Sequence, residues 1–97
     1  MDEFILNSKE RMEIFKILSE NKKLNFNKIS DLTKIHSNKL SYQLNLMKER
    51  DFIINEDGQY SLSINAQRLI PYFSQILKKE VGVLPVILGI VKNKGRI

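Results

Sequence analysis

The sequence contains no cysteine and no tryptophan, and its one histidine is His36. Without cysteine the chain can form neither a disulfide bond nor a thiolate metal site, and one imidazole cannot build a zinc site of several histidines. The sequence also lacks a nucleophile–base pair, an acid–base pair and a glycine-rich phosphate loop. We therefore expect no enzymatic activity, no catalytic residue, no metal and no cofactor.

Long hydrophobic runs are missing as well. The longest one covers residues 81–91 and is interrupted by Gly82, Pro85 and Gly89, whereas a membrane-spanning helix needs about 20 apolar residues. The chain opens on the acidic residues Asp2 and Glu3, where a secretory signal would be positive. With 97 residues, 42% of them hydrophobic and 28% charged, we expect a cytoplasmic, globular protein with one core and no membrane association.

Positive charge is present in excess and is concentrated in two places. The net charge is +5, from 16 Lys and Arg against 11 Asp and Glu. Residues 22–50 alone carry +5 and residues 81–97 carry +3, whereas residues 1–21 carry −2 and residues 51–80 carry −1. A local basic surface favours a polyanionic partner such as nucleic acid.

The apolar spacing predicts three helices in the first half of the chain. We expect a helix over 7–20 that starts at Asn7, a short extended link over 24–26, and a second helix over 27–34 capped by Asn27, with Ile29, Leu32 and Thr33 facing inward. After a tight turn at 35–37, Ser37 is expected to cap a third helix over 37–50. Its buried stripe consists of Leu40, Leu44 and Met47.

After residue 50 the spacing of the apolar residues changes from the pattern of a helix to that of short β-strands. Short strands are expected over 52–56 and 59–62, joined across Asp57-Gly58, a strong hairpin signal. Asn65 is expected to cap a fourth helix over 65–79, which Pro71 should kink or restart. The predicted fold class is mainly α with a small β-hairpin.

Three helices followed by a hairpin form a winged helix-turn-helix. The stretch from Asn27 to Ile53 resembles the bacterial and archaeal winged-helix regulators of the ArsR and MarR type, and the resemblance covers residues 7–79. Residues 37–44 look like their recognition helix, and residues 46–53 look like its exit into the wing. The resemblance implies a transcriptional regulator with three helices, a two-stranded wing and a C-terminal helix.

The candidate DNA contacts follow from side-chain chemistry. A recognition helix reads bases with its outward residues in the major groove of double-stranded DNA. The base contacts expected here are Asn38, Lys39, Ser41, Tyr42 and Asn45, and the expected phosphate contacts are Lys22, Lys23, Lys28, Lys34 and Ser37. We further expect a homodimer, formed through the helices over 7–20 and 65–79.

A second interpretation is a winged helix that binds another protein. The wing residues 55–59 include two acids and no Lys or Arg, and residues 37–49 contain no arginine. Acidic side chains near DNA phosphates are unfavourable. The sequence therefore leaves DNA binding and protein binding open, with DNA binding favoured by the charge of residues 22–50.

The tail fits the winged helix poorly, so we divide the chain into a domain over 1–80 and a tail over 81–97. Residues 83–91 read as a buried strand, residues 92–95 as a turn and residues 96–97 as the start of a second strand. This pattern weakly resembles the opening hairpin of a Nudix domain. The hypothesis is that the chain is the N-terminal part of a longer regulator; the alternative is a strand that pairs within a dimer.

Overall fold

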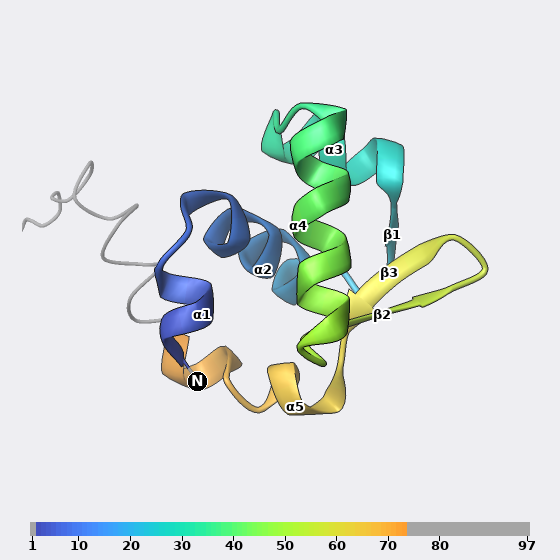
Figure 1. Ribbon diagram of the computed structural model, residues 1–97. Helices are drawn as coiled ribbons and strands as arrows, with labels where there is room; N and C mark the ends of the chain where they lie inside the picture. Colours follow the sequence, from blue (N-terminus) through green and yellow to red (C-terminus); the bar gives the residue numbers. More distant parts are fainter. Residues whose placement is uncertain (1, 74–97) are drawn as a thin grey trace, which may run out of the picture.

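The computed structural model describes residues 2–73 of the chain (Figure 1). The elements in order are α1 (Asp2–Leu6), α2 (Lys9–Glu20), β1 (Leu24–Asn25), α3 (Phe26–Thr33), α4 (Ser37–Glu49), β2 (Ile53–Glu56), β3 (Gln59–Leu62) and α5 (Ile64–Gln67). A further helical segment begins at Ile70. Figure 1 shows α4 crossing in front of α2, with the β2–β3 hairpin projecting to one side.

The strands form one antiparallel sheet in the order β1-β3-β2. The expected hairpin is confirmed, with Ile53 opposite Leu62 and Glu56 opposite Gln59. The extended link over 24–26 is a third strand in part, because Leu24 pairs with Tyr60 on the free edge of β3. This pairing attaches the start of α3 to the half of β3 that lies next to the wing turn, since Asn25 pairs with Gln59.

The core lies where α2, α4 and the sheet meet. The expected stripe of α4 is confirmed, since Leu40, Leu44 and Met47 are fully buried. From α2, Ile14 and Phe15 join them, and the Phe15 ring meets Phe73 edge to face at 5.2 Å. In α3 Ile29 is buried as expected, but the prediction for Leu32 is wrong: its side chain is 47% exposed.

The helices begin near the expected residues but at different caps. The observed N-caps are Ser8, Asn25, His36 and Ser63, in place of Asn7, Asn27, Ser37 and Asn65. Ser8, Asn25 and Ser63 have extended backbones and accept a hydrogen bond from the N–H three residues on, whereas His36 makes no side-chain cap bond. Capping requires this backbone geometry, and neighbouring Ser and Asn residues compete for it.

One expectation about helix continuity is corrected and one is confirmed. The helix expected over 7–20 is α2, which begins only at Lys9, and a short helix that the apolar spacing did not predict, α1, precedes it and ends at Leu6. The interruption expected at Pro71 is confirmed: α5 stops at Gln67 and a helical segment restarts at Ile70, so that Pro71 lies in a first turn, where its missing N–H costs nothing. Residues 74–79 and the proposed tail over 81–97 lie outside the described residues.

The tip of the wing imposes a backbone requirement. Asp57 and Gly58 both have positive φ, 54° and 80°, as a two-residue I′ hairpin turn demands. The Gly58 N–H donates to Asn55 Oδ1 at 3.1 Å, and a Cβ built on Gly58 would meet no atom within 4 Å. If a side chain at this position lowers the stability, the reason is therefore the positive φ of the backbone and not a steric clash with another residue.

We expect Gly58→Ala to lower the free energy of unfolding by about 1 kcal/mol, because alanine resists the left-handed conformation. Urea unfolding followed by circular dichroism measures this change. Gly58→Asn is the matched control and should cost less, since asparagine tolerates positive φ. Equal losses in the two variants would contradict the backbone explanation.

Candidate nucleic-acid interface

The turn between α3 and α4 is fixed by local hydrogen bonds. Lys34 ends α3 in the left-handed conformation with φ 62°, and its N–H donates to the Ser30 carbonyl at 2.8 Å. The Ser30 hydroxyl donates to the Ile35 carbonyl at 3.1 Å, and the Ile35 N–H donates to Thr33 Oγ1 at 3.2 Å. The Ile35 side chain is buried. These contacts set the angle at which α4 leaves α3.

Opposite its buried side, α4 presents an exposed polar surface. Asn38, Tyr42 and Asn45 recur at intervals of four and three residues, which places them on one side of a helix. All three are exposed, Tyr42 to 62%. We call these three residues the recognition face. Ser41 is also exposed and lies at its edge.

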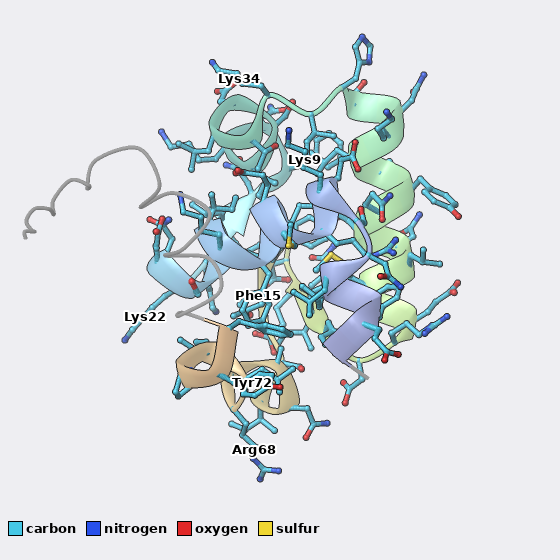
Figure 2. The ribbon with its side chains drawn as sticks, turned by 90° about the vertical axis from the view of Figure 1, so that its left-hand side faces the viewer. Lys9, Phe15, Lys22, Lys34, Arg68 and Tyr72 are labelled. Atoms are coloured by element: carbon cyan, nitrogen blue, oxygen red, sulfur yellow. The ribbon has the colours of Figure 1, made fainter. Side chains whose placement is uncertain are left out.

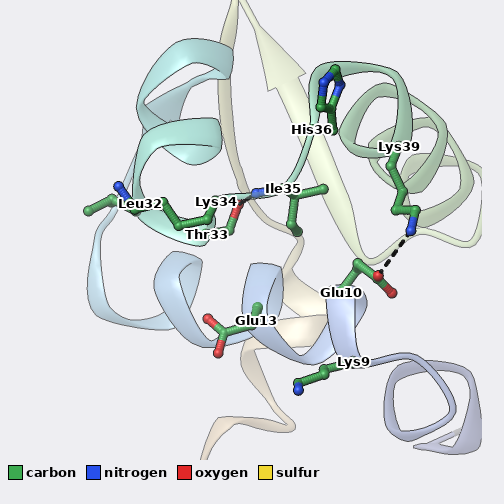
Figure 3. A pocket seen from close by; sticks show the side chains of 9 residues that line it. All are labelled: Lys9, Glu10, Glu13, Leu32, Thr33, Lys34, Ile35, His36 and Lys39. Atoms are coloured by element: carbon green, nitrogen blue, oxygen red, sulfur yellow. Dashed lines mark hydrogen bonds and ion pairs between the residues drawn. The ribbon is translucent and has the colours of Figure 1, made fainter.

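A third side of α4 is attached to the N-terminal helices. Lys39, Gln43 and Arg50 lie along one line of the helix, and we call them the docking stripe. Lys39 Nζ lies 3.7 Å from Glu10 Oε2, a pair drawn in Figure 3. Arg11 Nη1 donates to Gln43 Oε1 at 3.0 Å. Lys39, expected as a base contact, is therefore paired with α2.

The aromatic ring of Phe4 completes this attachment. The guanidinium carbons of Arg11 and Arg50 lie 4.2 and 4.6 Å from its centroid, and the ring stacks on Phe52 at 5.3 Å. Arg11 Nε also donates to the Phe4 carbonyl at 2.6 Å. Sequence reasoning missed Phe4, Arg11 and Gln43, because contacts between distant residues leave no periodic signal in the sequence.

The carboxylate of Glu10 is held in its charged form. Its pKa is lowered from the usual value of 4.5, mainly by a hydrogen bond from its own backbone N–H and further by the Ser8 hydroxyl and Lys39. The hydroxyl of Ser8 donates to Glu10 Oε1 at 3.3 Å. Glu10 is ionised at neutral pH, as any glutamate of ordinary pKa is, and the lowered pKa extends its charged form to more acidic pH.

The expected phosphate contacts do not gather in one place. Lys28, Lys34 and Ser37 are exposed on α3, at the turn and at the start of α4. Lys22 follows α2 on the side of the molecule away from α4, as Figure 2 shows. Lys23 Nζ lies 3.7 Å from Glu56 Oε1 in the wing. Lys34 and Ser37 thus lie at the start of α4, Lys28 lies in the first turn of α3, and Lys22 lies away from α4.

A groove of about 580 Å³ runs between the start of α2 and the α3–α4 turn (Figure 3). Its walls combine the apolar side chains of Leu32 and Ile35 with the charged groups of Lys9, Glu13 and Lys39.

Within residues 2–73, no group of three or more His, Asp or Glu side chains could hold a metal ion. None of the helices in this part of the chain is long and apolar enough to cross a membrane.

Comparison with known proteins identifies the architecture. No family model matches the chain, and no curated protein matches it. The crystal structure of ligand-free NadR has a TM-score of 0.76 at 18% sequence identity, covering 91% of this chain and 70% of the NadR chain. Quinone-bound YodB from B. subtilis has a TM-score of 0.72 at 15% identity, covering 81% of this chain and 89% of YodB. The fold is a winged helix.

Each part of the winged-helix fold can be matched to a helix or strand of this chain. The helix-turn-helix consists of α3 and α4, with α4 at the position of the recognition helix and the β2–β3 hairpin as the wing. The wing tip presents Glu56 and Asp57, both exposed. At identities below one fifth, the likeness to NadR and YodB extends to the fold alone.

Proposed function

We propose that this winged helix binds double-stranded DNA sequence-specifically, as the DNA-binding domain of a transcriptional regulator. The recognition face of α4 enters the major groove, where Asn38, Tyr42 and Asn45 contact bases and Ser41 contacts the groove edge. Lys28, Lys34 and Ser37 contact the flanking phosphates.

One observation carries the proposal: a helix that follows a fixed turn exposes uncharged hydrogen-bonding side chains on one side and buries Leu40, Leu44 and Met47 on the other. Such a helix can enter a groove without disturbing the core. Donors and acceptors of this kind match the edges of base pairs. The surrounding basic residues supply the attraction to phosphate that is common to all duplexes.

The test is a fluorescence titration of labelled duplex from a random pool at 50 and 200 mM salt. We expect the affinity to fall with salt, and Lys28→Ala and Lys34→Ala each to reduce the salt slope by about one. Lys22→Ala is the matched control and should change the slope less, since Lys22 lies away from α4 (Figure 2). Salt-independent binding, or none at 50 mM, would contradict the proposal.

We also propose that the chain acts as a homodimer, which would place two recognition helices about one turn of DNA apart. In α2, the first of the two helices expected at the dimer contact, the apolar residues Ile14, Phe15, Ile17 and Leu18 are buried in the chain's own core. Tyr72, which is 60% exposed, is the stronger candidate for a contact between copies. The stoichiometry of the same titration tests this: we expect two chains on each duplex.

The second candidate function is a protein-binding winged helix. It is favoured by the wing tip, residues 55–59, which contains no Lys or Arg and exposes the carboxylate of Asp57. In that case the recognition face would contact a partner chain, and the titration would detect no salt-dependent duplex binding.

A further inference from the structure

The base preference of α4 depends on which of its charged residues are free to reach DNA. Guanine is read most often by a long cation, Arg or Lys, which bonds to its O6 and N7 atoms, whereas adenine is read by the carboxamide of Asn or Gln. The helix carries three Lys or Arg residues at or near its exposed surface, namely Lys39, Lys48 and its C-cap Arg50. The structure shows where the side chain of each of these three residues lies relative to the recognition face.

Two of these cations belong to the docking stripe and interact with the N-terminal helices. Lys39 Nζ lies 3.7 Å from Glu10 Oε2 of α2, in a surface pair in which the Lys39 side chain is 62% exposed. Arg50 lies over the Phe4 ring of α1 at 4.6 Å. At about 100° per residue, Lys39 and Arg50 lie roughly a quarter-turn from the centre of the recognition face.

The third cation, Lys48, is exposed but lies in the last turn of α4. A recognition helix contacts base edges mainly with residues in its N-terminal part. Lys48 is therefore at the wrong end of the helix to read a base. The recognition face is left with two carboxamides, Asn38 and Asn45, and the phenol of Tyr42 between them.

From this arrangement we infer that α4 reads adenine·thymine pairs and makes no lysine or arginine contact to guanine. The inference rests on the proposed DNA binding. Asn38 and Asn45 each bond to the N6 and N7 atoms of an adenine, and Tyr42 packs its ring against a thymine methyl group. Seven residues of helix span about 10 Å, close to three base-pair steps of about 3.4 Å. The two adenines are thus expected roughly three steps apart.

The experiment is a selection of duplexes from a random pool by the full chain, followed by titration of the selected duplex and of copies with single A·T to G·C changes. We expect each change at a recognised adenine to weaken binding by about 5- to 100-fold. Asn45→Ala should abolish the preference at one position only. Asn45→Arg should convert that position to a preference for guanine, because arginine bonds to O6 and N7.

Lys39→Ala is the matched control on the same helix, and we expect it to leave the selected sequence unchanged. Thermal unfolding of each variant checks that the fold is intact. Selection of a guanine whose preference disappears in Lys39→Ala would overturn the inference while DNA binding itself stands. Absence of any salt-dependent binding to the pool would overturn the proposed function and the inference together.

Discussion

Replacing Leu40 by alanine is expected to lower the free energy of unfolding by about 2–5 kcal/mol. Its side chain is fully buried between α4 and the rest of the core. Removing it loses the transfer free energy of the deleted atoms and leaves a cavity that close-packed neighbours fill only in part. Since small domains are stable by about 5–15 kcal/mol, this one change removes a large share. Urea unfolding followed by circular dichroism measures it.

Leu32→Ala is the matched control, because it makes the same chemical change on the neighbouring helix of the helix-turn-helix. Leu32 is 47% exposed, and we expect a loss below about 1 kcal/mol. Comparing the two variants also tests which side of α3 packs against the core, since the apolar spacing alone predicts that Leu32 is buried. Similar losses in the two variants would contradict the orientation of α3 in the structure.

The second large effect is expected at Arg11, which joins α1 to α4. Arg11→Met removes hydrogen bonds to the Phe4 carbonyl at 2.6 Å and to Gln43 Oε1 at 3.0 Å, together with the contact to the Phe4 ring. It also leaves Gln43, which is only 8% exposed, without this partner. An unpaired buried polar group costs about 1–3 kcal/mol. We expect a loss of that size in urea unfolding.

A double variant separates the unpaired amide from the lost packing. In Arg11→Met/Gln43→Leu both polar partners are replaced by apolar groups, and we expect part of the lost stability to return. Lys9→Met, an exposed change on the same helix, should have little effect. If the double variant were less stable than Arg11→Met by the full cost of Gln43→Leu alone, the two side chains would not be coupled.

The wing illustrates how far local patterns reach. Asp57-Gly58 predicts the hairpin because few dipeptides accept two residues of positive φ, and the turn then fixes the register of β2 against β3. The local pattern predicts an extended link over 24–26 but not that it pairs as β1. Leu24-Asn25 is too short to show an alternation, and it becomes a strand only because β3 offers it an unpaired edge.

In the helices, too, some features follow from the local sequence and others only from the tertiary structure. The spacing of Leu40, Leu44 and Met47 predicts the buried side of α4, because a helix can bury such residues along only one stripe. The helix starts are off by one or two residues, since neighbouring Ser and Asn residues are chemically equivalent caps until the backbone selects one. Leu32 is apolar and periodic, yet no helix or strand within residues 2–73 covers it fully, and it is 47% exposed.

For the candidate interface, the sequence by itself determined the winged-helix order of elements and the polar residues that α4 exposes, because both follow from periodicities along one short segment. It equally offered Lys39 as a base contact. Only the tertiary structure decided that Lys39 is paired with Glu10 and that Gln43 meets Arg11. Those contacts join residues on separate helices, and their partners are chosen by the packing of α1 and α2 against α4, which leaves no periodic pattern in the sequence.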